Sequence, residues 1–140
     1  MTRKYRLIDT NIASYLIKRR FPAVRSRYLE FDQSEVGMSV VSKAEILYGL
    51  RLLEPDHHLH VASERFFSDI TILPWVEAAA APYAEFKHRL GRAGKVIGAM
   101  DQMIAAHAVA IGAILVTNNV RHFEWLAPDV EIENWVDTSG

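Results

Sequence analysis

Several absences limit what this protein can be. The 140-residue sequence contains no cysteine, which excludes disulfide bonds and thiolate metal sites. No apolar run approaches the roughly 20 residues of a membrane-spanning helix, and the charged segment MTRKYRLID is not followed by an apolar signal region. The net charge of −1 argues against a protein that coats polyanions. We expect a cytoplasmic protein without membrane association, whose metal ligands are oxygen or imidazole and whose nucleic-acid site is a local patch.

Hydrophobic side chains are plentiful and make up 50% of the sequence, which suits one domain spanning residues 1–140. Short apolar segments alternate with longer segments of helical periodicity, an order typical of a parallel sheet flanked by helices. We predict strands near residues 5–9, 36–41, 71–75, 113–117 and 130–135. We predict helices over residues 11–20, 23–31, 42–53, 57–68, 77–92 and 101–111. Pro22 should separate the first two helices, because proline favours a first helical turn and breaks a running helix.

The segment GRAGKVIGAM, residues 91–100, combines three glycines with Lys95. A phosphate-binding P-loop needs four residues between its glycines and a serine or threonine after the lysine. Here two residues separate Gly91 from Gly94, and Val96 follows the lysine. We therefore predict a loop and exclude a nucleoside-triphosphate site.

Polar side chains follow several of the predicted strands. Asp9 ends the first strand, Glu45 lies in the first turn of the helix after the second, and Asn118 and Asn119 follow the fourth. In open α/β sheets, functional groups gather beyond the carboxyl ends of the strands. Asp101 heads a helical face of small and apolar residues, so it should project towards the sheet. We expect these side chains to share one cleft.

Each of these residues also has an ordinary structural explanation. Ser42 and Glu45 have the spacing of a capping box, and Asp9, Asp101 and Asn119 could cap or stabilise the start of a helix. Three carboxylates in one cleft, however, would repel one another unless a cation compensated them. Mg²⁺ or Mn²⁺ supplies that charge through oxygen ligands. Taken together, the residues favour a divalent metal site.

The segments LIDTN, SVVSKAEILYG, GAMDQMIAAHA and ILVTNNVRHF occur in this order between residue 7 and about residue 135. Together they resemble the PIN-domain ribonucleases of the VapC type, the toxin half of a type II toxin–antitoxin pair. The resemblance implies a three-layer α/β/α sandwich with a central, mainly parallel five-stranded sheet. It also implies Mg²⁺- or Mn²⁺-dependent cleavage of tRNA or another structured RNA, which inhibits translation and growth. The implied partners are RNA, a cognate antitoxin that occupies or disturbs the active site, a second copy in a homodimer, and a higher toxin–antitoxin assembly.

The resemblance also assigns roles to individual residues. Asp9, Glu45 and Asp101 match the three core acidic positions and would be catalytic and metal-binding. Asn119 stands where the family commonly has a fourth acidic residue, so the site would hold one ion tightly and recruit a second with the substrate phosphate. Glu124 could supply the missing charge or simply be exposed. The supporting residues would be Thr10, Asn11, Thr117, Asn118 and Glu124, and the candidate RNA phosphate contacts are Arg19, Lys43, Arg89, Arg92 and Lys95.

The histidines and tryptophans give weaker evidence of a functional site. His57 and His60 lie one helical turn apart and could form a metal pair, but without a third ligand an exposed helix start is the better explanation. His107 is expected to be packed or solvated, and His88 and His122 have no predicted role. Core packing explains the tryptophans better than base stacking does; they are Trp75, Trp125 and Trp135.

Other functions compete with the ribonuclease toxin. A haloacid-dehalogenase-like phosphatase needs a second aspartate two residues after the first, where this chain has Asn11. A PIN nuclease that cleaves DNA or processes RNA would keep the same site. A noncatalytic RNA- or antitoxin-binding module would keep the fold without needing three converging carboxylates. Metal binding by the intact protein separates the last possibility from the others.

Overall fold

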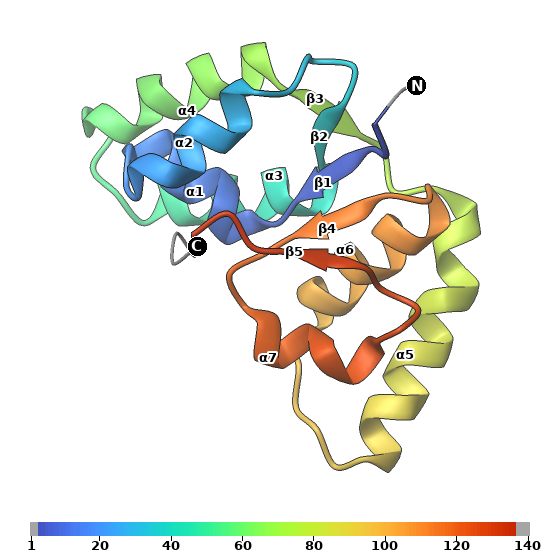
Figure 1. Ribbon diagram of the computed structural model, residues 1–140. Coiled ribbons are helices and arrows are strands. Elements are labelled where there is room, and N and C mark those ends of the chain that lie inside the picture. Colours follow the sequence, from blue (N-terminus) through green and yellow to red (C-terminus); the bar gives the residue numbers. More distant parts are fainter. Residues whose placement is uncertain (1–2, 137–140) are drawn as a thin grey trace.

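The computed structural model describes residues 3–136 and contains one five-stranded sheet (Figure 1). The strand order is β3-β2-β1-β4-β5, and all neighbouring strands are parallel. The predicted α/β class and mainly parallel five-stranded sheet are therefore confirmed. The hydrogen-bonded strands are shorter than predicted: β1 Arg6–Ile8, β2 Val36–Ser39, β3 Thr71–Leu73, β4 Ile114–Val116 and β5 Ile132–Glu133.

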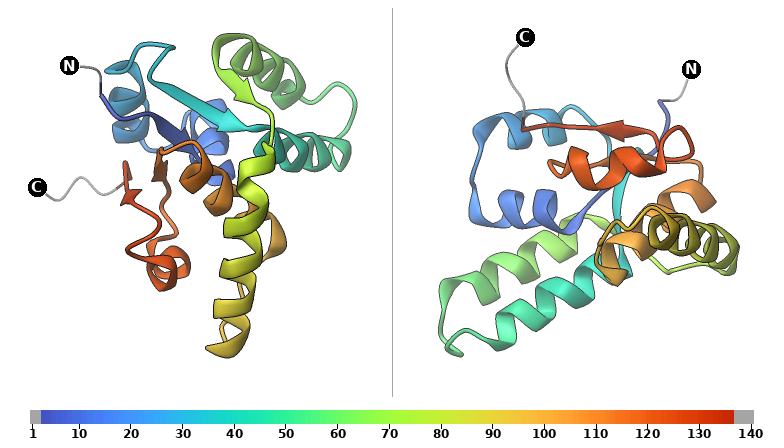
Figure 2. Two further views of the ribbon diagram at one scale, coloured as in Figure 1. Left: turned by 90° about the vertical axis from the view of Figure 1, so that its right-hand side faces the viewer. Right: turned by 90° about the horizontal axis from the view of Figure 1, so that it is seen from below.

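Helices cover both faces of the sheet (Figure 2). Successive residues of a strand point to opposite faces, and β1 shows the consequence: Leu7 packs with the core that includes Phe86 and Leu90, whereas Ile8 packs with Ile12. No helix among residues 3–136 has the length and apolar character needed to cross a membrane. The helices are α1 Thr10–Lys18, α2 Pro22–Leu29, α3 Val40–Arg51, α4 His58–Asp69, α5 Ala80–Arg92, α6 Ala99–Ala110 and α7 Val120–Phe123, with short 3-10 turns η1 Glu77–Ala79 and η2 Glu124–Leu126.

The predicted break at Pro22 is confirmed, since α1 ends at Lys18 and α2 begins at Pro22. Arg19 and Phe21 adopt left-handed backbone conformations between the two helices. The predicted loop over residues 91–100 is confirmed for residues 93–98, whereas its two ends belong to α5 and α6. Gly94 within the loop has a φ of 68° that favours glycine.

The start of α3 was predicted wrongly. The helix begins at Val40, two residues before the expected start, because the Ser39 side chain accepts a hydrogen bond from the Val41 N–H and caps it. The β-branched residues Val40 and Val41 favour a strand locally, and this cap overrides that preference. The predicted Ser42–Glu45 capping box is therefore wrong, and Glu45 lies in the second turn of the helix.

The turns of α7 and η2 were not predicted at all. Each contains only three or four residues, which is too short for hydrophobic periodicity to be visible in the sequence. They are held to the core by Phe123 and Leu126, which are both fully buried. This segment follows β4 and therefore lies directly after the residues at the strand end.

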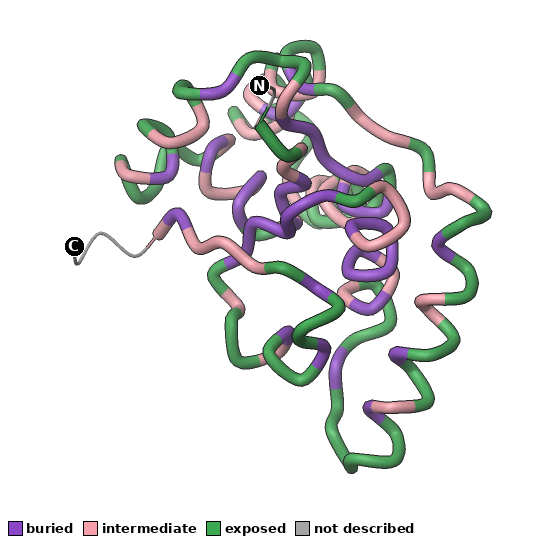
Figure 3. The backbone as a smooth tube through the Cα atoms, turned by 45° about the vertical axis from the view of Figure 1, so that its right-hand side comes forward, coloured by how far each residue is buried: buried purple, intermediate pink, exposed green. Residues whose placement is uncertain are grey.

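The central strands and α6 contain much of the buried core (Figure 3). His107 of α6 is part of it: the side chain is 0% exposed, and its Nδ1 lies 2.9 Å from Ser39 Oγ. Among the described residues, its Nε2 has no hydrogen-bond partner. The packed alternative for His107 is confirmed, and burial lowers its pKa because the charged form loses hydration.

His107 should make the fold less stable in mild acid. The unfolded chain takes up a proton near pH 6.5 that the folded chain, with a lower His107 pKa, does not bind. The free energy of unfolding should therefore fall from about pH 7.5 to 5.5, by up to about 1.4 kcal/mol per pH unit. Because protonation of Asp9 stabilises the fold over the same pH range, the comparison is made in the Asp9→Asn background. Urea unfolding of Asp9→Asn and of Asp9→Asn/His107→Gln across this range measures the difference. Equal pH slopes of the two proteins would contradict the prediction.

Candidate active site

The strand order brings distant segments to one edge of the sheet. The chain proceeds from β1 to β2 and β3 on one side, and then returns to place β4 on the other side of β1. Loops leaving β1 and β4 therefore diverge at a topological switch point, where α/β proteins form their binding crevices. Asp9 follows β1, and the Thr117–Asn119 segment follows β4.

Asp9 is the buried carboxylate of this edge, with 4% of its surface exposed. Its backbone N–H donates to Val116 O at 2.9 Å, which holds it beside the end of β4. Its side chain caps α1 by accepting from the Ile12 N–H at 2.9 Å. The capping explanation is thus correct for Asp9, but one cap does not account for burying a whole carboxylate.

The surroundings of Asp9 disfavour the charged form of its side chain. Its pKa is raised from 3.8 to about 6, mainly because burial removes the charged form from water and also because Asp101 and Glu45 carry like charges nearby. Hydrogen bonds from the Thr117 side chain and the Ile12 N–H act in the opposite direction. These charge effects show that the fold brings Asp101 and Glu45 within electrostatic reach of Asp9.

Glu45 is positioned by the opposite helix. The Thr10 hydroxyl, in the first turn of α1, donates to Glu45 Oε1 at 2.5 Å and lies 3.0 Å from Ser42 Oγ. Thr10 therefore connects α1 to α3 immediately after Asp9. The predicted supporting position of Thr10 is explained by this contact, which fixes the direction of the Glu45 side chain.

Asp101 lies in the first turn of α6 and does not cap its own helix, whose N-cap is Gly98. Burial raises the pKa of Asp101, and the nearby His122 lowers it. His122 Nδ1 is 3.8 Å from Asp101 Oδ2 and 2.9 Å from Asn119 Nδ2. His122 thus links the amide at the fourth family position to one of the carboxylates.

The donor set suits a hard divalent cation, although its carboxylates do not form a ready-made cage. Among residues 3–136, no three acidic or histidine side chains are grouped closely enough to hold a metal by themselves. In the same part of the chain, the one ion-pair partner recorded for Asp9, Glu45 or Asp101 is His122. Mg²⁺ binds through only one or two carboxylates and keeps several waters, so it does not require such a cage.

The other candidate residues occupy different positions. The Thr117 hydroxyl oxygen accepts from the Asn119 N–H at 2.9 Å, so Thr117 connects Asp9 to the fourth position. Asn118 accepts from Asn134, and Asn11 and Glu124 are exposed.

The candidate RNA contacts have different surroundings. Arg89 forms ion pairs with Glu85 and Asp129, and Lys43 lies over Phe67. Arg19 and Arg92 are exposed, and Lys95 lies over Trp125.

Sequence reasoning missed two side chains near this edge, His122 and Trp125. Trp135 and Trp75 pack as predicted, but Trp125 is 46% exposed, so core packing is wrong for it. Phe123 and Leu126 are three residues apart and form the buried face of the short turns α7 and η2. Had these turns been predicted, this spacing would have shown that His122 and Trp125 lie next to the buried face. His57 caps α4 through Nδ1, which explains it as a helix start.

A parallel α/β/α fold with acidic side chains at its switch point is what the resemblance to PIN domains implies. The PIN domain family model matches residues 6–126. The chain belongs to the PIN-domain family.

Proteins similar to this chain indicate which branch of the PIN-domain family it belongs to. Ribonuclease VapC2 of Haemophilus influenzae is 40% identical over 131 residues, covering 93% of this chain and 97% of the relative. The tRNA(fMet)-specific endonuclease VapC of Shigella flexneri is 37% identical over 130 residues, covering 92% and 96%. The solved structure of DNA-bound VapBC from Salmonella typhimurium has a TM-score of 0.84 at 31% identity and covers 95% of this chain and 99% of that chain. Within the PIN-domain family, the chain belongs with the VapC ribonucleases.

Proposed function

We propose that this protein is a divalent-metal-dependent endoribonuclease and the toxin of a toxin–antitoxin pair. The observation that carries the proposal is the buried Asp9 carboxylate, whose charge is opposed by Asp101 and Glu45 and which forms no ion pair with a cationic side chain among the described residues. A hydrolase that binds metal uses such a site, whereas a binding module has no need of it. The VapC relatives, one of them named for tRNA(fMet), make structured RNA the first substrate class to test.

Each residue of the site would have a distinct role in catalysis. Asp9 and Asp101 would hold the ion directly, and Glu45, kept in place by Thr10, would bind the ion or a water beside it. When bound, the ion would polarise the phosphoryl oxygen and make a water ligand a better nucleophile. Asn119, oriented by Thr117 and His122, would position an amide at the fourth site without adding charge.

Cleavage of total cellular RNA by the purified protein tests the proposed function. Discrete cuts are expected with Mg²⁺ or Mn²⁺ and none with EDTA. Because water rather than the RNA 2′-hydroxyl is the nucleophile, the fragments should carry 5′-phosphate and 3′-hydroxyl ends. Cyclic phosphate ends would contradict the mechanism, and DNA cleavage without RNA cleavage would favour the alternative PIN nuclease.

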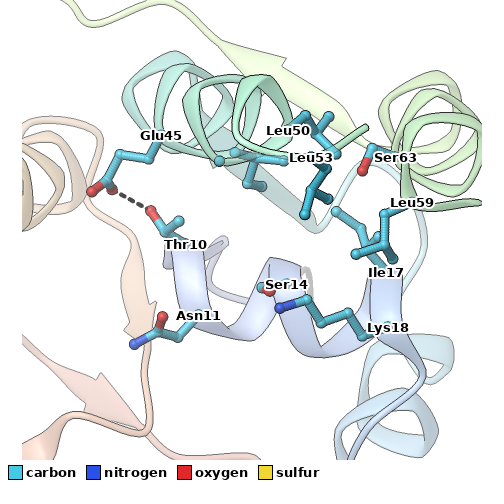
Figure 4. Close-up of a pocket in the computed structure, with 12 residues that line it drawn as sticks. Thr10, Asn11, Ser14, Ile17, Lys18, Glu45, Leu50, Leu53, Leu59 and Ser63 are labelled. Atoms are coloured by element: carbon cyan, nitrogen blue, oxygen red, sulfur yellow. Dashed lines mark hydrogen bonds between the residues drawn. The ribbon is translucent and has the colours of Figure 1, made fainter. Parts of the chain in front are cut away.

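A pocket of about 280 Å³ adjoins the acidic edge and offers a docking place for an antitoxin segment (Figure 4). Thr10 and Glu45 lie at one end of it, and apolar side chains line the rest, including Ile17 of α1, Leu59 of α4 and Leu53, which follows the end of α3. A peptide with an apolar face could fill this groove and end beside Glu45. We propose that the antitoxin uses it, since the structural neighbours are VapBC complexes.

Leu53→Glu should therefore weaken binding of the cognate antitoxin by about 30-fold or more, because a charge would enter an apolar contact. The free variant should still cleave RNA, which shows that it is folded. Titration of antitoxin into the cleavage reaction measures the loss, with Leu29→Glu on the exposed side of α2 as the matched control. Wild-type inhibition of Leu53→Glu would contradict the docking place, and an altered oligomeric state would assign the groove to a second copy. The homodimer itself stays a prediction.

A further inference from the structure

Trp125 is the exposed tryptophan of the described chain and belongs to neither hydrophobic core. It lies in η2, three residues after His122. Phe123 and Leu126, also three residues apart, are both fully buried and anchor the turn. His122 and Trp125 each precede one of these anchors, so they project from the same side of the turn.

This geometry connects Trp125 to the acidic edge. His122 contacts Asn119 and lies 3.8 Å from Asp101, so the side of the turn that carries it faces the site. One helical turn further along that side is Trp125. The spacing therefore separates Trp125 by one turn from the residue that contacts the site.

Lys95 gives the ring a positive partner. The loop between α5 and α6 places Lys95 Nζ 4.1 Å from the centroid of the Trp125 ring. This is a cation–π contact. In the described part of the chain, no carboxylate forms an ion pair with Lys95, or with the neighbouring exposed residues Arg92 and Arg121. The surface therefore combines a partly exposed indole, covered on one face by Lys95, with cations that form no ion pair among the described residues.

We propose that Trp125 is a stacking platform for one unpaired base of the RNA next to the cleaved phosphate, and that Lys95 moves from the ring to a backbone phosphate when the base enters. This inference rests on the proposed ribonuclease function and adds a recognition residue to it. Aromatic stacking with nearby lysine or arginine is how proteins hold single-stranded RNA. An apolar protein segment would have no comparable use for the unpaired cations.

The test measures stacking directly. RNA spanning a mapped cut site, with 2-aminopurine replacing each flanking base in turn, is bound to the inactive Asp9→Asn protein. Stacking on Trp125 should quench the fluorescence at one position, and Asp9→Asn/Trp125→Ala should remove that quenching and weaken binding about tenfold or more. Trp125→Phe should preserve most of the affinity. Lys95→Gln should reduce the salt dependence of binding by about one phosphate contact.

Matched variants separate the possible results. In the active protein, Trp125→Ala should raise KM with little change in kcat, whereas Leu29→Ala, another exposed apolar residue, should change neither. Unchanged KM and quenching in Trp125→Ala, with normal cleavage, would overturn the platform alone. Absence of both RNA binding and cleavage in the wild type would overturn the proposed function. Loss of antitoxin binding without loss of RNA binding would assign Trp125 to a protein interface and overturn the platform.

Discussion

Replacing Asp9 with asparagine is expected to lower the rate of RNA cleavage by at least about 100-fold, since losing a residue that only hydrogen-bonds to a metal ligand already costs about 10- to 100-fold. The amide keeps the shape of the side chain and can still accept from the Ile12 N–H, so α1 keeps its cap. What is removed is the negative charge that a divalent ion needs. Single-turnover cleavage at saturating Mg²⁺ measures the loss.

The same substitution should make the protein more stable. The pKa of Asp9 is about 6 in the folded chain and 3.8 ordinarily, a difference equivalent to about 3 kcal/mol. Because the folded pKa is the higher one, the charge destabilises the fold fully above pH 6 and not at all below 3.8. Asp9→Asn should therefore raise the free energy of unfolding by up to about 3 kcal/mol at pH 8, and the gain should disappear in acid.

Metal and a matched variant complete this test. Mg²⁺ should stabilise the wild type but not Asp9→Asn, because a ligand that binds only the folded state raises its stability. Asp56→Asn, which neutralises an exposed carboxylate, should change neither stability nor cleavage. Wild-type cleavage by Asp9→Asn would remove Asp9 from the metal site. Lower stability of Asp9→Asn at pH 8 would show that its charge is compensated within the fold.

Replacing Trp135 with alanine should cost about 3–5 kcal/mol of stability. Trp135 is 2% exposed and stacks on Phe31 with ring centroids 5.5 Å apart. Its indole N–H also donates to Glu133 Oε1 at 2.6 Å, beside Arg6 and Arg27, which form ion pairs with the same carboxylate. The variant thus leaves a cavity and removes a donor from Glu133. Chemical denaturation of wild type and variant measures the loss.

Two further tryptophan variants divide this effect. Trp135→Phe keeps a ring against Phe31 but loses the N–H and part of the buried volume, so its cost includes the hydrogen bond to a charged acceptor, about 1.5–3 kcal/mol, and a smaller cavity than Trp135→Ala leaves. Trp125→Ala removes an exposed tryptophan and should change stability by no more than about 0.5 kcal/mol. A small effect for Trp135→Ala, similar to that of Trp125→Ala, would mean that the contacts at β5 contribute little to the fold.

Much of the architecture could be predicted without coordinates. The alternation of short apolar runs with helical periods predicted the α/β class, and Pro22 marked the boundary between α1 and α2. The order of the four motifs predicted the PIN-domain family. Periodicity and proline chemistry act between residues that are neighbours in the chain, so they are visible in the sequence.

Boundaries and short turns were harder to predict. Ser39 rather than Ser42 caps α3, because the Ser39 side chain accepts a hydrogen bond from the Val41 N–H. α7 and η2 are too short to have a period, and their position depends on Phe123 and Leu126 reaching a core built by other elements. The role of His122 and the exposure of Trp125 were missed for this reason.

The sequence by itself determined the types of side chain available: carboxylates at strand ends, no thiolates, and an amide at the fourth position. Tertiary structure decided which of them meet. Placing β4 beside β1 puts Thr117 against Asp9, packing α1 on α3 brings Thr10 to Glu45, and α7 brings His122 between Asn119 and Asp101. The pKa of Asp9 arises from the same packing, because burial and the charges of its neighbours depend on residues far apart in the chain.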